Sequence, residues 1–143
     1  MKWVHPDIYW KYINSFSPDI CLAPLVDSMY NRAKSNLRLL EYWTAGNNLV
    51  IASKLNGGHY KDTIVDGKNG LLATNDWFEK IEYAIQHPEL REKLGKAGYE
   101  TVKKDFNLET NARKWVNAVQ SVIDSYHSDK QAPEQYIAPE FRK

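Results

Sequence analysis

The chain has little cysteine and no long apolar run. Its 143 residues include one cysteine, Cys21, so it cannot form an internal disulfide, and a reducing compartment is expected. The longest apolar runs fall far short of the roughly 18 residues of a transmembrane helix. Residues 1–6 lack the apolar core of a signal peptide. These absences predict a cytoplasmic protein without a transmembrane segment.

Excess charge of one sign and metal-binding clusters are also missing. Lys and Arg number 19 against 18 Asp and Glu, and no basic block stands out, so no nucleic-acid partner is expected. The four histidines are scattered, and no Cys or His pair shows metal-ligand spacing. The phosphate-binding and dinucleotide-binding glycine motifs and the G-x-S-x-G motif are absent. The histidine and cysteine spacing therefore does not predict a zinc site.

What is present is an alternation of short apolar segments with helical patterns. Nearly continuous apolar runs, typical of parallel strands buried on both faces, occupy residues 20–23, 49–52 and 71–73. Helical patterns are predicted at residues 7–16, 35–45 and 61–65, and three further helices begin near Asp76, Pro88 and Asn107. This order predicts an α/β fold with a parallel sheet and flanking helices. We expect one domain over residues 1–126 and a flexible polar tail over residues 127–143.

Several details of the helices can also be predicted. The helix at 35–45 is expected to bury Leu37, Leu40 and Thr44 and to end at Gly46. Asp76 with Glu79 predicts a capping box at the next long helix. The helix at 88–106 contains Gly95 and Gly98, which interrupt its apolar pattern. The last helix carries Trp115, Val119, Val122 and Ile123 at helical spacing.

The segment between the first two strands is the best candidate for a binding site. A helix N-terminus just past the carboxyl end of a strand is a natural anion site, at the sheet edge where α/β proteins bind ligands. The loop before the helix supplies side chains that suit phosphate or sugar hydroxyls, namely Arg32, Lys34, Ser35 and Asn36. Glu41, inside the helix, could accept hydrogen bonds from paired hydroxyls.

Each of these residues also has a simpler interpretation. Lys34 could be a solvated loop lysine, and Ser35 and Asn36 could be N-cap residues. Glu41 could be a surface glutamate or the ion-pair partner of Arg38, three residues before it. Asn31 could orient the loop or contact a sugar.

The ordered set of motifs resembles a known family. The matching segments are residues 19–25, 31–46, 57–58, 66–72, 87–91 and 97–106. Together they resemble the C-terminal, nucleotide-sugar-binding domain of the GT-B-fold glycosyltransferases, in the retaining "group 1" family. The resemblance covers roughly residues 1–125. It implies a Rossmann-like sheet and the transfer of a sugar from a nucleotide-activated donor to an acceptor hydroxyl in glycan biosynthesis.

The resemblance also assigns roles to the candidate residues. It implies that Lys34, Ser35 and Asn36 contact phosphate or sugar, that Glu41 contacts the ribose and that Asn31 belongs to the same site. Many members need no metal, and the nucleotide sugar is a substrate rather than a cofactor. Many members also carry a glutamate where this chain has Ala33. A branch of the family instead carries N-x-x-K-S-N, which matches Asn31 to Asn36 here.

Much of a complete enzyme has no counterpart in this sequence. The resemblance covers one truncated domain, without the family's N-terminal domain, its first two C-terminal strands or the basic pair that meets the diphosphate. If residues 2–4 are the third strand of the order 3-2-1-4-5-6, the strand at 20–23 loses its central neighbour. We therefore expect a partner chain or a second copy at that open edge. Two functions remain open: a glycosyltransferase fragment or subunit, or a non-catalytic interaction module. No catalytic residue can be named.

Overall fold

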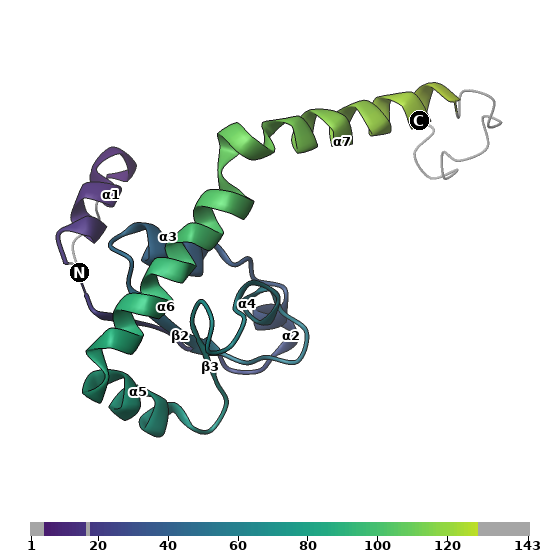
Figure 1. Cartoon of the computed structure of the whole chain (residues 1–143). Coiled ribbons are helices and arrows are strands. Elements are labelled where there is room, and N and C mark those ends of the chain that lie inside the picture. Colours follow the sequence, from purple (N-terminus) through teal and green to yellow (C-terminus); the bar gives the residue numbers. More distant parts are fainter. Residues whose placement is uncertain (1–4, 17, 129–143) are drawn as a thin grey trace. The chain divides into compact units, whose positions relative to one another are not determined.

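The computed structural model describes residues 5–16 and 18–128, and its centre is a parallel sheet. The three strands are β1 (Ile20–Ala23), β2 (Leu49–Ser53) and β3 (Leu71–Ala73), in the order β1-β2-β3. Around them are α1 (Pro6–Asn14), α2 (Met29–Arg32), α3 (Leu37–Thr44), α4 (His59–Thr63), α5 (Trp77–Gln86) and α6 (Pro88–Thr101), as Figure 1 shows. The predicted α/β fold with a parallel sheet is confirmed.

The chain divides into two units, residues 1–106 and residues 107–143, and each is described by itself. The first holds the sheet and ends in the π-helical segment Val102–Phe106. Within the described residues, the second consists of α7 (Leu108–Ser128). This helix continues two residues into the predicted tail, and the rest of that tail, 129–143, lies outside the described residues.

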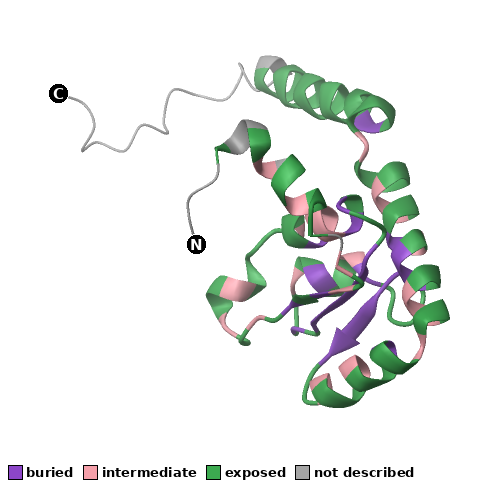
Figure 2. Cartoon of the chain, turned by 90° about the vertical axis from the view of Figure 1, so that its left-hand side faces the viewer, coloured by how far each residue is buried: buried purple, intermediate pink, exposed green. Residues whose placement is uncertain are grey.

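The sheet is covered on both faces, which explains why its strands are nearly all apolar (Figure 2). One face packs against α3 and α4 through Cys21, Ala23, Val50, Ala52, Leu72, Leu39, Trp43, Tyr60 and Ile64. The other packs against α5 and α6 through Leu49, Ile51, Leu71, Ala73, Ala84 and Leu94. Strand β2 lies in the middle and is buried along its whole length.

Two glycines of α6 allow this helix to pack closely against the rest of the sheet unit. A Cβ at Gly95 would lie 1.7 Å from the carbonyl oxygen of Asn47, and one at Gly98 would lie 2.1 Å from Nε1 of Trp43. Trp43 is fully buried, and its Nε1 has no hydrogen-bond partner. Helix α6 runs through both glycines, so they do not interrupt it.

The predicted buried face of α3 is wrong at two of its three residues, since only Leu40 is partly buried and packs against the core. Leu39 and Trp43 are the buried residues of this helix, whereas Leu37 is 55% exposed and Thr44 is exposed. The predicted helix end at Gly46 also differs, because the C-cap is Ala45. Residue Asn47 has the left-handed φ of 57°. Asparagine tolerates this conformation better than most residues.

The capping box predicted at α5 does not form. Asp76 is the N-cap residue but makes no side-chain cap bond. Its carboxylate instead accepts a hydrogen bond from the backbone N–H of Thr74, at 2.9 Å, and pairs with Lys80 at 2.9 Å. Lys80 also donates to the carbonyl oxygen of Leu72. The aspartate therefore fixes the turn that follows β3.

Strand β1 is at the edge of the sheet. It pairs with β2 in parallel, from Ile20 opposite Leu49 to Ala23 opposite Ala52, and no second strand joins it within the described residues. Leu22 is 41% exposed although it lies in the middle of the strand. The predicted strand at residues 2–4 lies outside the described residues. The open edge expected at residues 20–23 is thus present in the described part of the chain.

Candidate functional site

A groove of about 400 Å³ opens at the carboxyl end of β1 and follows α3. Three of the five predicted site residues line it, namely Lys34, Ser35 and Glu41. Its other walls are Leu22, Ala23, Pro24, Leu25, Leu37, Arg38, Tyr42 and Tyr60. Asn31 and Asn36 are not among the lining residues. The groove therefore combines an apolar wall with two cations and one carboxylate.

Glu41 is the carboxylate of the groove, and its side chain is 13% exposed. The hydroxyl of Tyr9, on α1, donates to Oε2 of Glu41 at 3.4 Å. Nε of Arg38 lies 3.7 Å from the same oxygen. Burial and the nearby negative charge of Glu41 raise the pKa of Tyr9, so the phenol remains a donor at neutral pH. Both contacts fall on Oε2, so in the described part of the chain Oε1 is the oxygen of Glu41 that can accept hydrogen bonds from a ligand.

The two cations of the groove differ in how they are held. Lys34 is exposed, and its ammonium lies 5.1 Å from the centre of the Tyr30 ring. Arg38 lies 5.8 Å from the centre of the Tyr42 ring and near Glu41. Since Lys34 makes no ion pair in the described part of the chain, its charge remains available to an anion.

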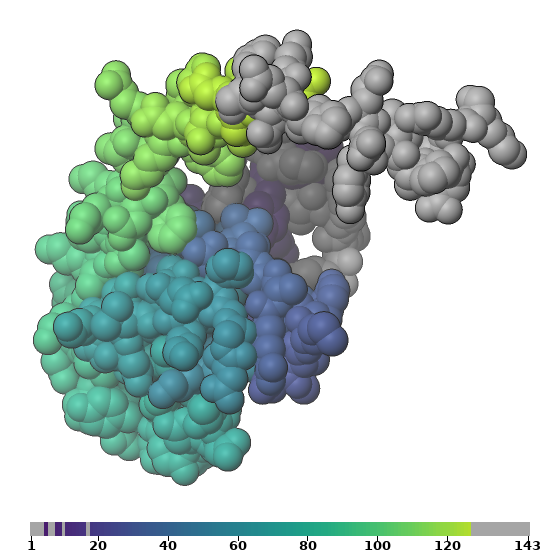
Figure 3. Space-filling model, turned by 90° about the vertical axis from the view of Figure 1, so that its right-hand side faces the viewer, coloured from purple at the N-terminus to yellow at the C-terminus, as the bar shows by residue number. Residues whose placement is uncertain are grey.

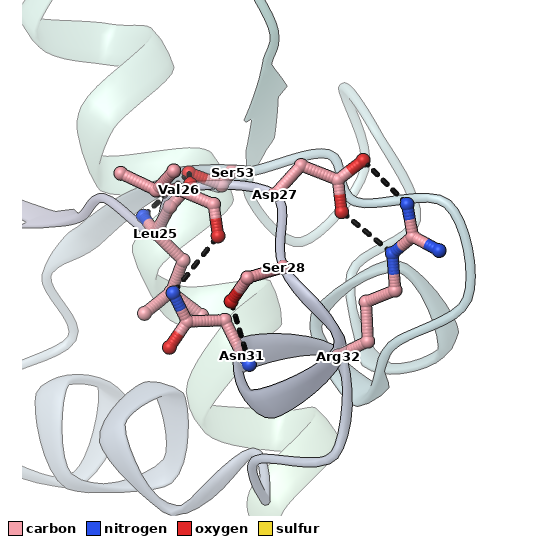
Figure 4. Close-up of polar contacts among 7 residues, drawn as sticks. All are labelled: Leu25, Val26, Asp27, Ser28, Asn31, Arg32 and Ser53. Carbon is pink, nitrogen blue, oxygen red and sulfur yellow. Dashed lines mark hydrogen bonds and ion pairs between the residues drawn. The ribbon is translucent and has the colours of Figure 1, made fainter.

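Arg32 is not available in the same way. Its guanidinium makes two hydrogen bonds to the carboxylate of Asp27, at 2.6 and 2.8 Å (Figure 4). This contact lowers the pKa of Asp27 and neutralises Arg32 locally. The loop that holds this pair lies beside the turn before α4, because a Cβ at Gly58 would lie 3.6 Å from the carbonyl oxygen of Arg32. Figure 3 shows the two segments side by side, in blue and teal.

The loop after β1 is fixed by side-chain contacts to the backbone (Figure 4). The buried Ser53 Oγ accepts from the N–H of Leu25 at 2.7 Å and donates to its carbonyl oxygen at 3.0 Å. The side-chain amide of Asn31 donates to the carbonyl oxygen of Val26 at 2.8 Å. Ser28 caps α2 by accepting from the N–H of Asn31. Asn31 therefore orients the loop, which is one of the two roles considered for it.

Asn36 links two helices rather than facing the groove. It is the N-cap residue of α3 without a side-chain cap bond. Its side-chain amide donates to Oγ1 of Thr63, at the end of α4, at 2.9 Å. A role for Asn36 in ligand contact stays a prediction, and in this structure its amide is used to hold α4 against the start of α3.

Three groove residues with a polar side-chain group were not selected from the sequence, namely Arg38, Tyr42 and Tyr60. Arg38 and Tyr42 could have been found, because Arg38 lies one turn before Glu41 on α3 and Tyr42 lies one turn after Arg38. Tyr60 comes from α4, and no spacing in the sequence connects it with α3. Within the described residues, no group of three His, Cys, Asp or Glu side chains could hold a metal ion.

The comparison with known families supports the assignment from the fold. A family model described as "Glycosyl transferase-like" matches residues 1–117. The chain belongs to this glycosyltransferase family. A solved C-terminal domain of a glycosyl transferase group 1 family protein (LpcC) from Francisella tularensis is similar in structure, with a TM-score of 0.58 and 22% identity over 76% of this chain and 53% of that one. The resemblance to a GT-B C-terminal domain is confirmed.

Curated relatives match over a shorter segment. Trehalose synthases from Pyrococcus horikoshii and Pyrococcus furiosus are 31% and 32% identical over 67 and 66 residues, 46% and 45% of this chain. The match spans 16% of the length of each relative.

In the described part of the chain, no helix has the length and apolar character needed to cross a membrane.

Proposed function

We propose that this chain binds the nucleotide-sugar donor of a glycosyltransferase that acts in glycan biosynthesis. The observation that carries the proposal is the groove beside β1, where the Glu41 carboxylate and the Lys34 ammonium line the same walls. A nucleotide sugar has a diol and a diphosphate in one molecule, and these two groups require an acceptor and a cation, respectively.

The roles follow from where the residues lie. Lys34 and Ser35, just before the N-terminus of α3, contact the phosphates, where the helix dipole favours negative charge. Glu41 lies deeper along the same helix and accepts from the ribose hydroxyls through Oε1. Stabilisation of the departing diphosphate is electrostatic and needs fixed donors. We propose that these side chains provide it without a metal or a cofactor.

We propose that the complete enzyme includes a protein partner at the open edge of β1. Leu22 and Ala23 belong both to this edge strand and to the wall of the groove. A segment that pairs with β1 would therefore extend the groove as well as the sheet, and unpaired apolar edges are normally covered. We place the assembly in the cytoplasm, because the single cysteine fits a reducing compartment.

The test is a titration of the purified chain with UDP, GDP and their sugar conjugates, by calorimetry and thermal shift. A ligand at 100 times its dissociation constant adds about 2.7 kcal/mol to the free energy of unfolding. Glu41→Gln keeps the shape and removes the charge, so it should weaken binding by about tenfold. The matched control is Glu82→Gln, an exposed glutamate on α5, which should bind like the wild type.

The alternative is a non-catalytic interaction module that keeps the fold. It is favoured by Ala33, at the position where the family resemblance implies a glutamate in many members. The side chain of alanine cannot accept a hydrogen bond. A folded chain that binds no nucleotide at millimolar concentration would support this alternative. Binding that is equally strong in wild type and Glu41→Gln would refute the role of Glu41 but not the donor site.

A further inference from the structure

A second pocket lies at the carboxyl edge of the sheet, beside the groove. It has a volume of about 330 Å³, and we call it the edge pocket. Its lining consists of Leu25 and Asp27 after β1, residues 53–56 at the end of β2, and residues 73–75 and 77 at the end of β3. Leu25 also lines the groove, so the two cavities share a wall. Open α/β sheets bind their ligands at this edge.

The backbone around the edge pocket is held in place after each strand. Ser53 Oγ accepts from the N–H of Leu25 and donates to its carbonyl oxygen (Figure 4). The N–H of Lys54 donates to the carbonyl oxygen of Ala73 at 2.8 Å and joins the ends of β2 and β3. Asp76 fixes the turn that follows β3. The edge pocket is therefore preformed, which is typical of small-ligand sites and reduces the cost of binding.

The polar side chains of the edge pocket are less committed than its backbone. Lys54, Asn56 and Asn75 are exposed, and none of the three makes a side-chain hydrogen bond or ion pair in the described part of the chain. An asparagine amide both donates and accepts hydrogen bonds, and an ammonium donates them. These groups therefore suit hydroxyl groups, each of which can donate and accept.

Trp77 supplies the apolar part of the pocket. It is partly buried and packs against the core between the sheet, α5 and α6, and it also lines the edge pocket. An aromatic ring has a flat face of negative potential. One face of a sugar ring carries C–H groups that match this surface, while the hydroxyls at the rim of the sugar reach polar side chains. The lining therefore combines the two kinds of contact that a sugar ring needs.

The charges around the edge pocket favour a neutral ligand over a diphosphate. Asp27 is paired with Arg32, and Asp76 is paired with Lys80. Lys54 is thus the one lining charge without an ion pair in the described part of the chain, whereas the groove offers two cations. The volume lies at the lower end of the range for small-molecule sites, so it suits one sugar ring rather than a nucleotide.

We propose that the edge pocket binds a sugar ring of the acceptor, next to the donor in the groove. This inference rests on the proposed sugar transfer, which requires the donor sugar and the acceptor hydroxyl to lie close together. The wall that Leu25 forms between the two cavities gives that proximity. The acceptor is then a glycan, and this chain contributes to its recognition as well as to donor binding.

NMR spectroscopy of the isotope-labelled full chain tests the proposal. The probes are the methyl glycosides of glucose, galactose, mannose and N-acetylglucosamine. At millimolar concentration at least one of them should shift the indole N–H signal of Trp77 and the backbone signals of Lys54 and Asn75. The indole signal is identified by its loss in Trp77→Phe, a change that keeps an aromatic ring against the core.

Two exposed lining residues provide variants that keep the fold. Lys54→Met and Asn75→Ala each remove hydrogen bonds to the sugar and should raise its dissociation constant about tenfold. Lys93→Met changes an exposed lysine of α6 outside the pocket and should leave the constant unchanged. Circular dichroism checks that each variant is folded. A glycoside that binds both pocket variants as tightly as the wild type would overturn the proposal.

A second titration separates this inference from the donor site. The glycoside should bind equally well to the free chain and to the chain saturated with UDP or GDP, whichever binds the groove, or with its sugar conjugate. Displacement by the conjugate alone would assign the edge pocket to the donor sugar, and an equal shift by inorganic phosphate would assign it to an anion. Either result, or the absence of any glycoside shift, overturns the acceptor site. Glycoside binding without nucleotide binding would support the sugar pocket and refute the donor groove.

Discussion

The packing of α6 leads to a sharp prediction about its glycines. Gly→Ala in a helix normally stabilises, by about 1 kcal/mol, because alanine loses less backbone entropy. Here the added Cβ at Gly95 would lie 1.7 Å from a backbone oxygen of Asn47, and at Gly98 it would lie 2.1 Å from the buried indole of Trp43. Neither neighbour is the flexible end of a side chain, so α6 must move away from the sheet unit.

The expected magnitude follows from these two opposing effects. Overpacking of a dense core costs about 1–3 kcal/mol, and a clash with backbone belongs at the upper end of this range. After the propensity gain, Gly95→Ala should lower the free energy of unfolding by about 2 kcal/mol. For a unit of this size, that is a loss of roughly 10 °C in melting temperature.

Urea unfolding followed by circular dichroism measures the effect, and Lys96→Ala is the matched control. Lys96 lies between the two glycines in sequence and is exposed, so its substitution should change stability by less than about 0.5 kcal/mol. In Gly98→Ala, the smaller ring of Trp43→Phe should restore part of the loss, as a double-mutant cycle would show. If Gly95→Ala were as stable as Lys96→Ala, the close packing of α6 would be refuted.

Three further predictions concern single side chains. Burial raises the pKa of the Cys21 thiol to about 11, so the unfolded chain loses this proton at a lower pH than the folded chain. The free energy of unfolding should therefore fall as pH rises from about 9 to 11. At pH 8 the thiol should react with DTNB only after urea unfolds the chain, and a fast reaction with folded protein would contradict this. The pKa of Asp76 is lowered to about 2 by hydrogen bonds from a backbone N–H and from Lys80, so its contribution is present above about pH 4 and is lost toward pH 2. Lys80→Met should raise that pKa in an NMR titration, and an unchanged value would show that the backbone bond alone sets it. Ser53→Ala removes both hydrogen bonds to Leu25 and should cost about 1–3 kcal/mol in urea unfolding, while a cost near zero would mean that water replaces the hydroxyl.

The order and type of the elements could be predicted from local sequence. The predicted strands at 20–23 and 71–73 match β1 and β3, and the strand at 49–52 matches β2 to within one residue. A short, continuous apolar run between turn signals is enough to specify a strand that is buried on both faces. Helix ends were less accurate, because caps depend on contacts such as those of Asp76 with its turn.

The candidate site could be predicted in part. Lys34, Ser35 and Glu41 follow from the position of a helix after a strand, and all three line the groove. Asn31 and Asn36 are polar residues of the same segment, but they use their amides to hold the loop and α4. Which polar side chains bind their own backbone and which face a groove depends on distances that the sequence does not contain.

The sequence by itself determined the α/β class, the strand positions and the helix that presents Glu41, because these depend on patterns within one segment. The tertiary structure decided which face of α3 is buried, since Gly98 lets α6 approach Trp43 of that helix. It also brought Tyr60 of α4 to the groove and the hydroxyl of Tyr9, on α1, to Glu41. Such choices depend on how surfaces fit together in three dimensions, and periodicity along the chain cannot specify that fit.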